Sequence, residues 1–394
     1  DTQELKEYSF TIHAVDALIH NFQYLVGRST KNYGPQVPVN TQAAVRLAKL
    51  HDELKANGYS GHELEVYLVR ILFCLFSEDT GIFRPFQFQQ YIEEQTAETG
   101  SDLGYKLADL FDALNTPEGE RKRPQGHILN EFPYVNGKLY EERLRSADFN
   151  KRMRDSLLEC CKLDWSKISP AIFGSMFQGV MDEEQRRHLG AHYTSEENIL
   201  KVINPLFMDE LREEFEASRT KLPKLKSLQK RISNIKILDP ACGCGNFLIV
   251  AYEKLRELEL DILKITKEDN PTFDIQQISG LDVDMMYGIE IEEFPAQIAQ
   301  VALWLIDHKM NNLYSEVLGD SLLRLPLKKS ANIHHANALQ TDWEDIVPKE
   351  KLTYIIGNPP FVGKQLQSKQ QKREIKQLIP LQNAGLLDYV SAWF

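Results

Sequence analysis

Short apolar runs alternate with helical apolar patterns through the second half of the chain, from residue 232 onward. Such alternation is typical of β-α-β units, because a parallel strand needs a crossover connection that is usually a helix. The pattern therefore predicts an α/β fold with a doubly wound, mostly parallel sheet. The expected strands are residues 235–239, 285–291, about 331–336 and 352–357, and the expected helices between them are residues 245–262 and 294–308.

A polar residue follows each of these predicted strands. The four residues are Asp239, Glu290, Asn337 and Asn358. Ligands of open α/β sheets bind beyond the carboxyl ends of the strands. We therefore expect the fold to bring these side chains, which are scattered over about 120 positions, to one crevice.

A glycine loop follows the first predicted strand. Residues 235–248 combine an apolar run, an acidic-proline turn, Gly243 and Gly245, and the start of a helical pattern. Glycines let backbone N–H groups approach a bound cofactor closely. Position 248 is leucine, so the third glycine of a dinucleotide-binding loop is missing. At the next strand end, Glu290 could accept both ribose hydroxyls of a nucleoside cofactor, although a solvated acid would leave the same pattern.

The last predicted strand ends at an amide, two prolines and an aromatic ring, Asn358 to Phe361. The Asn358 oxygen can accept one N–H of the exocyclic amino group of an extruded base, and the stiff Asn-Pro-Pro backbone can offer a carbonyl to the other. The ring of Phe361 would then stack on the base. Taken alone, the segment is equally consistent with a strand end closed by a proline turn.

Charge is distributed unevenly in this chain. A net charge of −11, with 26% charged and 42% apolar residues, describes an ordinary globular protein and not one whose whole surface binds nucleic acid. Basic residues nevertheless crowd the segment after Phe361. They form either a loop that holds DNA phosphates or a solvated surface helix. These residues are Lys364, Lys369, Lys372, Arg373 and Lys376.

Cysteine content and hydropathy indicate the compartment in which we expect the protein. There are five cysteines, an odd number that does not form a disulfide framework, so we expect a reducing compartment such as the cytoplasm. Cys242 and Cys244 lack a second ligand pair, and we expect no metal site. No apolar run is long enough to cross a membrane, and the first residues do not resemble an export signal.

The first part of the chain follows a different pattern. Apolar residues at helical spacing predict a helical domain over residues 1–165, followed by a second domain over residues 166–394. Ser195 has the side chain of a good N-cap and is expected to begin a helix that runs to about Phe215. The helical stretches expected in the first domain are residues 43–50, 64–76, 102–114 and 141–161.

Taken together and in order, several segments resemble the γ-class adenine-N6 DNA methyltransferases, which have the class I S-adenosylmethionine-dependent methyltransferase fold. The helix near residues 68–83 also looks like the helical connector of large single-chain type IIG and IIL restriction-modification enzymes. The segments that carry the resemblance are residues 189–195, 239–245, 288–291, 337–339 with 342–343, 358–361 and 387–390.

The resemblance implies roles for individual residues. Asn337, where many relatives carry aspartate, would contact the adenine of S-adenosylmethionine, since an amide oxygen still accepts a hydrogen bond. The implied cofactor-binding residues are Ala191, His192, Tyr193, Thr194, Asp239, Pro240, Ala241, Cys242, Gly243, Gly245, Glu290, Asn337 and Asn358. The implied catalytic residues are Asn358, Pro359, Pro360 and Phe361, and the implied DNA-binding residues are Lys364, Lys369, Lys372 and Arg373.

The resemblance further implies site-specific methylation of a flipped adenine in double-stranded DNA, as part of a restriction-modification system. In that group a nuclease precedes the connector and a recognition domain follows the methyltransferase. The Glu-x-Lys segments of the first domain, residues 4–6 and 53–55, lie in helical sequence, so we expect no nuclease in this chain. We also expect the last strands of the sheet and any recognition domain to be absent. Two alternatives stay open, which are methylation of a protein glutamine amide and a scaffold without turnover.

Overall fold

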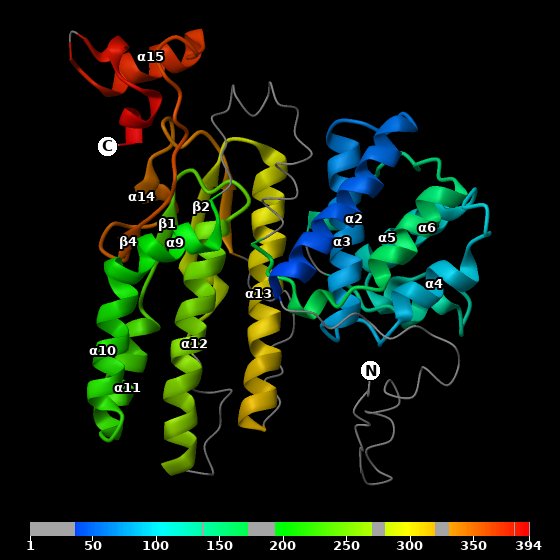
Figure 1. Ribbon diagram of the computed structural model, residues 1–394, viewed down its shortest axis with the longest axis horizontal. Coiled ribbons are helices and arrows are strands. Elements are labelled where there is room, and N and C mark those ends of the chain that lie inside the picture. Colours follow the sequence, from blue (N-terminus) through cyan, green and yellow to red (C-terminus); the bar gives the residue numbers. More distant parts are fainter. Residues whose placement is uncertain are drawn as a thin grey trace, which may run out of the picture.

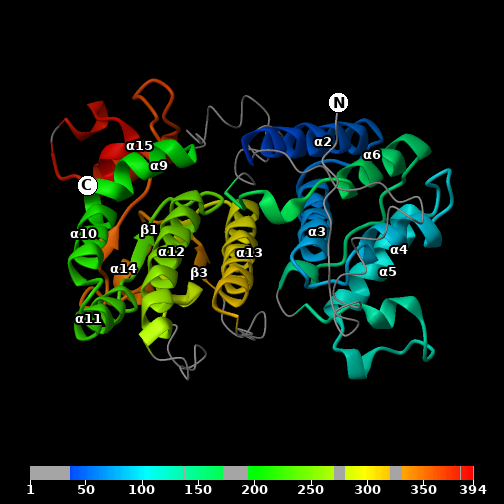
Figure 2. The ribbon, with the colours of Figure 1, turned by 60° about the horizontal axis from the view of Figure 1, so that its bottom comes forward.

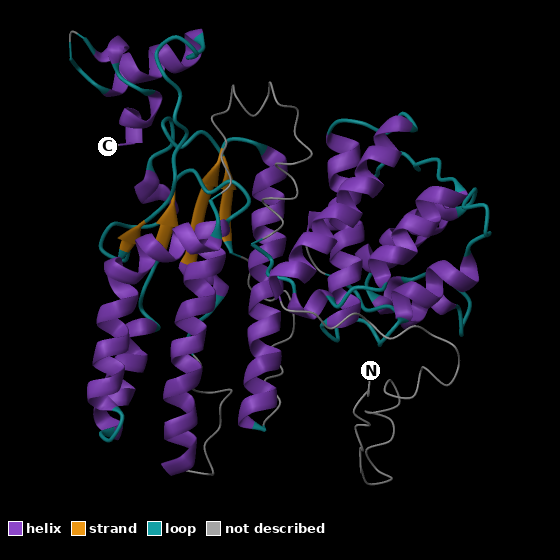
Figure 3. Ribbon diagram, viewed as in Figure 1, coloured by secondary structure: helices purple, strands orange, loops and turns teal. Residues whose placement is uncertain are grey.

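The computed structural model describes residues 36–135, 138–171, 194–269, 280–319, 331–381 and 383–393. Helices dominate, and the strands form a single small sheet (Figure 3). Along the chain a helical region, residues 36–171, precedes a region that contains the whole sheet, residues 194–393. This order confirms the predicted fold class. The predicted boundary between residues 165 and 166 stays a prediction.

The helical region is built around one almost completely buried helix. It contains α2 (Gln36–Ala56), α3 (His62–Asp79), α4 (Gln87–Gln95), α5 (Leu103–Asn115) and α6 (Lys151–Cys161). Every residue of α3 from Val66 to Glu78 is buried, as its broad apolar pattern predicted. The prediction of a helix over residues 141–150 is wrong. The Asn150 side chain accepts a hydrogen bond from the Met153 amide at 3.0 Å and so caps α6, whereas residues 141–150 form neither helix nor strand.

The sheet is fully parallel, with strand order β3-β2-β1-β4. Its strands are β1 (Ile237–Asp239), β2 (Met286–Glu290), β3 (Asn332–His335) and β4 (Tyr354–Ile355). Ile237 pairs with Met286 on one side and with Tyr354 on the other, so β1 is a central strand. The four predicted strands are confirmed, although each is shorter than its apolar run. A parallel sheet brings the carboxyl ends of all its strands to the same edge.

Long helices cover one face of this sheet. The helices of this region are α9 (Glu196–Ile203), α10 (Asp209–Ser218), α11 (Leu222–Ile232), α12 (Asn246–Asp269), α13 (Glu293–Leu318), α14 (Trp343–Ile346) and α15 (Lys369–Leu378). In Figure 1, α12 and α13 run downward from the carboxyl edge of the sheet, and the segment with α15 lies above that edge. On the other face a small cluster around Leu238 and Ile289 packs beside α14.

Local sequence signals set the ends of these helices. The Ser195 hydroxyl accepts from the Asn198 amide at 3.4 Å and begins α9, as predicted. The expected helix to Phe215 is interrupted by a π-turn at Asn204–Met208, where Pro205 has no N–H to donate. Gly319, in the left-handed conformation with φ 69°, ends α13.

The two regions contact each other along α3 and α13, which lie side by side in Figures 1 and 2. The rings of Phe73 and Trp304 stack at 5.2 Å between centroids. His308 donates from Nε2 to the Thr80 carbonyl at 2.8 Å, and the Asn312 amide donates to the same oxygen at 2.7 Å. Burial lowers the pKa of His308, which favours a neutral imidazole that donates from that nitrogen. The apolar core is therefore continuous between the regions.

No helix within the described ranges combines the length and the apolar character that a membrane span requires.

Candidate active site

The four polar residues predicted from the strand pattern do lie along one edge of the sheet. Asp239 ends β1 and Glu290 ends β2, while Asn337 and Asn358 follow β3 and β4 within three residues. Short backbone hydrogen bonds join these segments, because the Cys242 amide donates to Ile289 O at 3.0 Å and the Ala336 amide to Glu290 O at 2.8 Å. The candidate site is this carboxyl edge, at the top of the sheet in Figure 1.

The glycine loop lies between β1 and α12. Gly243 has φ 53° and Gly245 has φ 84°, a backbone conformation that glycine adopts without strain. A Cβ on Gly245 would lie 3.0 Å from the Cβ of Ala299, so the loop packs tightly on α13. By contrast, nothing lies within 4 Å of a Cβ built on Gly243. The loop is thus closed on its α13 side and open at Gly243.

Glu290 holds this loop from the next strand. Its Oε2 accepts from the Gly243 amide at 2.8 Å, and its Oε1 accepts from the Glu292 amide at 3.0 Å. Burial raises the pKa of the Glu290 carboxyl, and these amide hydrogen bonds oppose that rise. The acid predicted from the strand end is therefore a structural partner of the loop and not a solvated side chain.

Asp239 is the most deeply buried acid at this edge, with 1% of its surface exposed. Its Oδ1 accepts from the Ala241 amide at 3.0 Å. Burial, with a smaller contribution from the negative charge of Glu290, raises the pKa of Asp239 to about 7. A Cβ on Gly357 would lie 2.4 Å from Asp239 Oδ1, so only glycine fits there. Bound positive charge would stabilise ionised Asp239.

Asn358 lies at the end of β4, beside β1. Its Nδ2 donates to the hydroxyl of Thr194 at 3.2 Å, which leaves its Oδ1 as an acceptor. Pro359 and Pro360 are half-buried, whereas the ring of Phe361 is 57% exposed. An oriented amide acceptor, a rigid backbone and an accessible ring are what recognition of a flat, amino-bearing group requires.

Asn337 is held at both ends of its carboxamide. Its Oδ1 accepts from the Leu339 amide at 3.0 Å, and its Nδ2 donates to Glu374 at 2.8 Å. Glu374 lies on α15, 37 positions further along the chain. The sequence reasoning placed Asn337 at the strand end correctly but gave no role to Glu374, an acid inside a basic run.

Residues 362–393 form a compact C-terminal lobe above the sheet edge. Its small core consists of Val362, Ile375, Ala384 and Tyr389. The lobe contacts the site, because Trp393 donates from Nε1 to the Pro240 carbonyl at 3.4 Å. No feature of the sequence predicted this contact.

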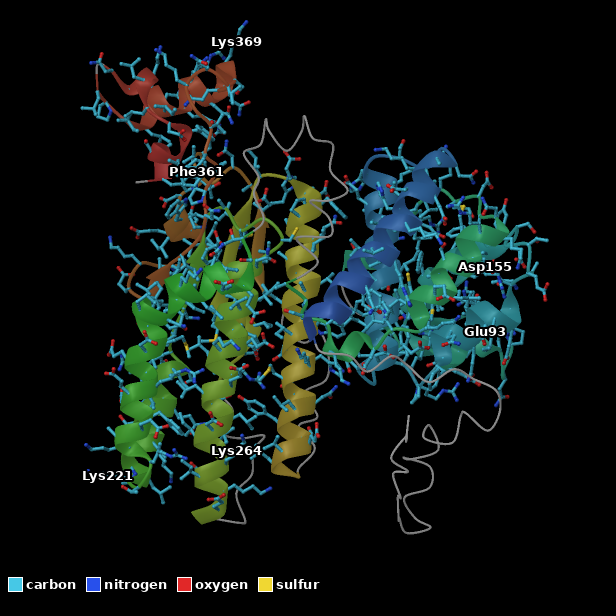
Figure 4. All side chains as sticks on the ribbon, viewed as in Figure 1. Glu93, Asp155, Lys221, Lys264, Phe361 and Lys369 are labelled. Atoms are coloured by element: carbon cyan, nitrogen blue, oxygen red, sulfur yellow. The ribbon has the colours of Figure 1, made fainter. Side chains whose placement is uncertain are left out.

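The predicted DNA-binding residues lie on this lobe. Ser368 and Gln371 form a capping box that begins α15, so Lys369, Lys372 and Arg373 lie on a helix, whereas Lys364 lies in a turn before it. Binding of DNA phosphates by these residues stays a prediction. Lys364, Lys369 and Arg373 are exposed, and Lys372 is half-buried. In Figure 4, Phe361 lies at the base of the lobe and Lys369 at its far end.

Three predicted cofactor residues, Ala191, His192 and Tyr193, lie outside the described residues. The cofactor loop contributes Pro240, Ala241 and Cys242 beside its glycines. Asn246, the first residue of α12, has an Oδ1 that is buried without a hydrogen-bond partner among the described residues. A buried unpaired acceptor is costly unless a ligand or water pairs with it, so Asn246 is a further candidate contact that sequence reasoning missed.

The fold and the site together define a class of protein. A parallel sheet with a glycine loop after β1 and an acid at the end of β2 is the arrangement of enzymes that bind a nucleoside-containing cofactor. Residues 62–140 match the model of the MmeI helicase spacer domain, and residues 214–394 match the model of the MmeI DNA-methyltransferase domain. The chain belongs to this family: it comprises an MmeI-type spacer followed by an MmeI-type DNA-methyltransferase domain.

Individual relatives agree with this assignment. A structure of the type IIL restriction-modification enzyme MmeI in complex with DNA is 51% identical, with a TM-score of 0.83, over 93% of this chain and 48% of that chain. DNA methyltransferase A of Bacillus subtilis is 37% identical over 100% of this chain and 45% of its own length. The adenine-specific methyltransferase PglX of Streptomyces coelicolor is 29% identical over 30% of this chain and 9% of its own length. The chain thus spans about half the length of MmeI and of DNA methyltransferase A.

Proposed function

We propose that this chain transfers a methyl group from S-adenosylmethionine to the N6 amino group of a flipped adenine in double-stranded DNA. The observation that carries the proposal is the position of Asn358. Its amide is oriented by Thr194 at 3.2 Å, at the end of the strand next to the one that bears Asp239 and the glycine loop. Family membership and the adenine specificity in the name of PglX support the same reaction.

The residues present fit the proposed cofactor. S-adenosylmethionine carries a positive sulfonium and a positive ammonium group, and the site offers two acids, Asp239 and Glu290, whose pKa values are raised by burial. Space at Gly243 gives room at the same loop, and the Oδ1 of Asn246, which has no hydrogen-bond partner among the described residues, gives an acceptor. Asp239 and the loop would hold the amino acid portion, Glu290 the ribose hydroxyls, and Asn337 the adenine. Ala191, His192 and Tyr193, which lie outside the described residues, would contact the methionine end.

When bound, the cofactor would supply a methyl group on a positively charged sulfur, ready for direct displacement. The protein's own contribution would be to position the acceptor nitrogen. Asn358 Oδ1 would accept one N–H of the adenine amino group and the Pro359 carbonyl the other, which raises electron density on that nitrogen. Phe361 would stack on the extruded base. Because the nitrogen lone pair forms the new C–N bond, its extra proton can leave to water afterwards, and no tuned general base is needed.

Double-stranded DNA is the proposed partner. The exposed side chains of Lys364, Lys369 and Arg373 lie on the lobe that follows Phe361, where they could bind phosphates beside the extruded base. The relative MmeI is named as a restriction-modification enzyme, and this chain would act in the same kind of system. Nuclease and recognition functions would be carried by other domains or subunits, and the site of action would be the cytoplasm.

Replacing Asn358 by alanine tests the proposal. Transfer of radiolabelled methyl groups to unmethylated genomic DNA should fall by about a thousandfold or more, because one of the two acceptors is lost. Binding of S-adenosylhomocysteine, measured by calorimetry, should stay within about threefold, since the cofactor contacts lie mainly on β1 and β2.

The matched control is N383A, at an exposed asparagine of the C-terminal lobe, which should leave transfer unchanged. Retained turnover in N358A would contradict the role of Asn358. Label that appears on protein and not on DNA would favour the alternative substrate, a glutamine side-chain amide.

A further inference from the structure

Glu374 is a buried carboxylate that collects four side-chain donors. It is 4% exposed. Its Oε1 accepts from Asn337 at 2.8 Å, from Gln340 at 2.9 Å and from Gln370 at 3.1 Å. Its Oε2 accepts from the hydroxyl of Tyr389 at 2.5 Å. One side chain of α15 thus joins the segment after β3 to the end of the C-terminal lobe.

Glu374 acts as an anion in this network. Burial by itself would raise the pKa of its carboxyl, but the hydrogen bonds from Tyr389, Gln370, Asn337 and Gln340 hold the pKa below its usual value. An ionised carboxylate can only accept hydrogen bonds, so each neighbour must turn a donor toward it. Asn337 is therefore fixed with Nδ2 toward Glu374 and Oδ1 on the other side, where the Leu339 amide donates at 3.0 Å.

The network spans two sides of the site. On the cofactor side, the Ala336 amide next to Asn337 donates to Glu290 O at 2.8 Å. On the target side, the Tyr389 amide donates to Val362 O at 3.1 Å, directly after Phe361. Glu374 contacts Asn337 and Tyr389 together. It is therefore placed to pass a change on one side to the other.

We propose that Glu374 is a positioning residue, an inference that rests on the proposed function. It orients the Asn337 carboxamide for the cofactor's adenine and couples cofactor binding to the lobe that follows the target-base segment. The competing explanation is that Glu374 only holds the lobe together. The two explanations differ in what happens when the amide and the carboxylate exchange places.

The test exchanges them. N337D places a carboxylate against Glu374 at hydrogen-bond distance, and the repulsion should weaken binding of S-adenosylhomocysteine by about tenfold or more. Adding E374Q supplies an amide that donates to the new carboxylate at position 337, so N337D/E374Q should bind within about threefold of the wild type. Calorimetry gives the affinities, and thermal unfolding of each variant reports stability separately.

Two controls isolate the contact. N383D makes the same chemical change at an exposed position of the lobe, and Q370A removes one donor of Glu374 without touching Asn337. The affinity of both variants for S-adenosylhomocysteine should stay within about twofold of the wild-type value. If N337D does not fold, the double variant alone decides, because it restores the pair.

The outcomes separate the two proposals. Recovered affinity in N337D/E374Q supports a role of Glu374 in orienting residue 337 for cofactor binding. A folded double variant that regains thermal stability but not affinity overturns it, since Glu374 would then be structural only. A wild-type protein that does not bind S-adenosylhomocysteine overturns the proposed function, and this inference with it.

Discussion

Two glutamates, one in each region, each accept hydrogen bonds from two backbone amides but serve different purposes. In the helical region, Glu78 accepts from the amides of Phe88 and Gln89 at 2.7 and 3.0 Å and holds the start of α4. In the sheet region, Glu290 accepts from the amides of Gly243 and Glu292. Glu78 lies inside a closed apolar core, whereas Glu290 lies at the open edge of a sheet, beside Asp239.

At the sheet edge, acidic side chains lie without a neighbouring cation among the described residues. Within the described ranges, neither Asp239 nor Glu290 forms an ion pair, although the buried Arg256 of α12 is paired with Asp307 at 2.8 Å. The negative charge of Glu290 adds to the rise in the pKa of Asp239, and neighbouring acids without a cation destabilise the site. Uncompensated charge of this kind is typical of functional sites, because a ligand completes the balance. Under the proposed function, the helical region would serve stability and the sheet edge would serve binding.

The largest expected effect is on stability and falls in the helical region. Trp165 is fully buried, packs on Phe76 at 5.5 Å between ring centroids, and donates to the Cys160 carbonyl at 2.9 Å. W165A should lower the free energy of unfolding by about 3–5 kcal/mol through the cavity it leaves. Chemical denaturation measures this loss, and affinity for S-adenosylhomocysteine at low temperature should stay unchanged.

The exposed Tyr105 offers a control, since Y105A should change neither quantity. An affinity loss in folded W165A would contradict the division of roles.

The next effect compares the two glutamates directly. E290Q keeps the shape of the side chain but loses an acceptor, so affinity for S-adenosylhomocysteine should fall about 30- to 100-fold, or about 2–3 kcal/mol. Its unfolding free energy should change by less than about 1 kcal/mol, because relief of the buried charge offsets the lost hydrogen bond.

E78Q is the matched change in the helical region. It should lower the unfolding free energy by about 1–3 kcal/mol, because the amides of Phe88 and Gln89 would then both bond to a neutral amide oxygen instead of a carboxylate oxygen. Affinity should stay within about twofold, because the change lies far from the site. Calorimetry and denaturation on both variants check the contrast. If E78Q and E290Q behaved alike, the comparison between the regions would fail.

The smallest expected effect is a pH dependence at Asp239. Its pKa in the folded protein is raised to about 7, so the folded state binds a proton more tightly than the unfolded chain does. This group therefore favours folding at low pH, and its contribution is lost as pH rises from about 4 through about 7. The raised pKa of Glu290 acts in the same direction.

Cofactor binding should show the opposite trend. A positively charged ligand favours ionised Asp239, so affinity for S-adenosylmethionine should increase about tenfold between pH 6 and pH 8, with release of a proton. Calorimetry in two buffers of different ionisation enthalpy measures that proton. D239N removes the titrating group and should flatten the pH profile. A slope that persists in D239N would assign the dependence to another group.

The sequence predicted much of the sheet region because its signals are local. Apolar runs located all of the strands, and the polar residues that follow them, from Asp239 to Asn358, do share one edge. The prediction was wrong for residues 141–150, which form turns and irregular loop and bury only Ala147 and Phe149, because so few apolar contacts do not stabilise a helix. The capping box at Ser368 was also legible in the sequence, yet the basic residues around it left loop and helix equally plausible.

Composition and residue spacing were enough to predict the fold class, the glycine loop and the position of Asn358 after a strand. Neighbouring residues alone fix strand pattern, turn conformation and side-chain chemistry. Only the tertiary structure decided which groups meet. Thr194 orients Asn358 across 164 positions, and Glu374 reaches Asn337 across 37. Such contacts depend on how strands and helices pack, and a single acid or hydroxyl carries no periodic signal in the sequence that could reveal its partner.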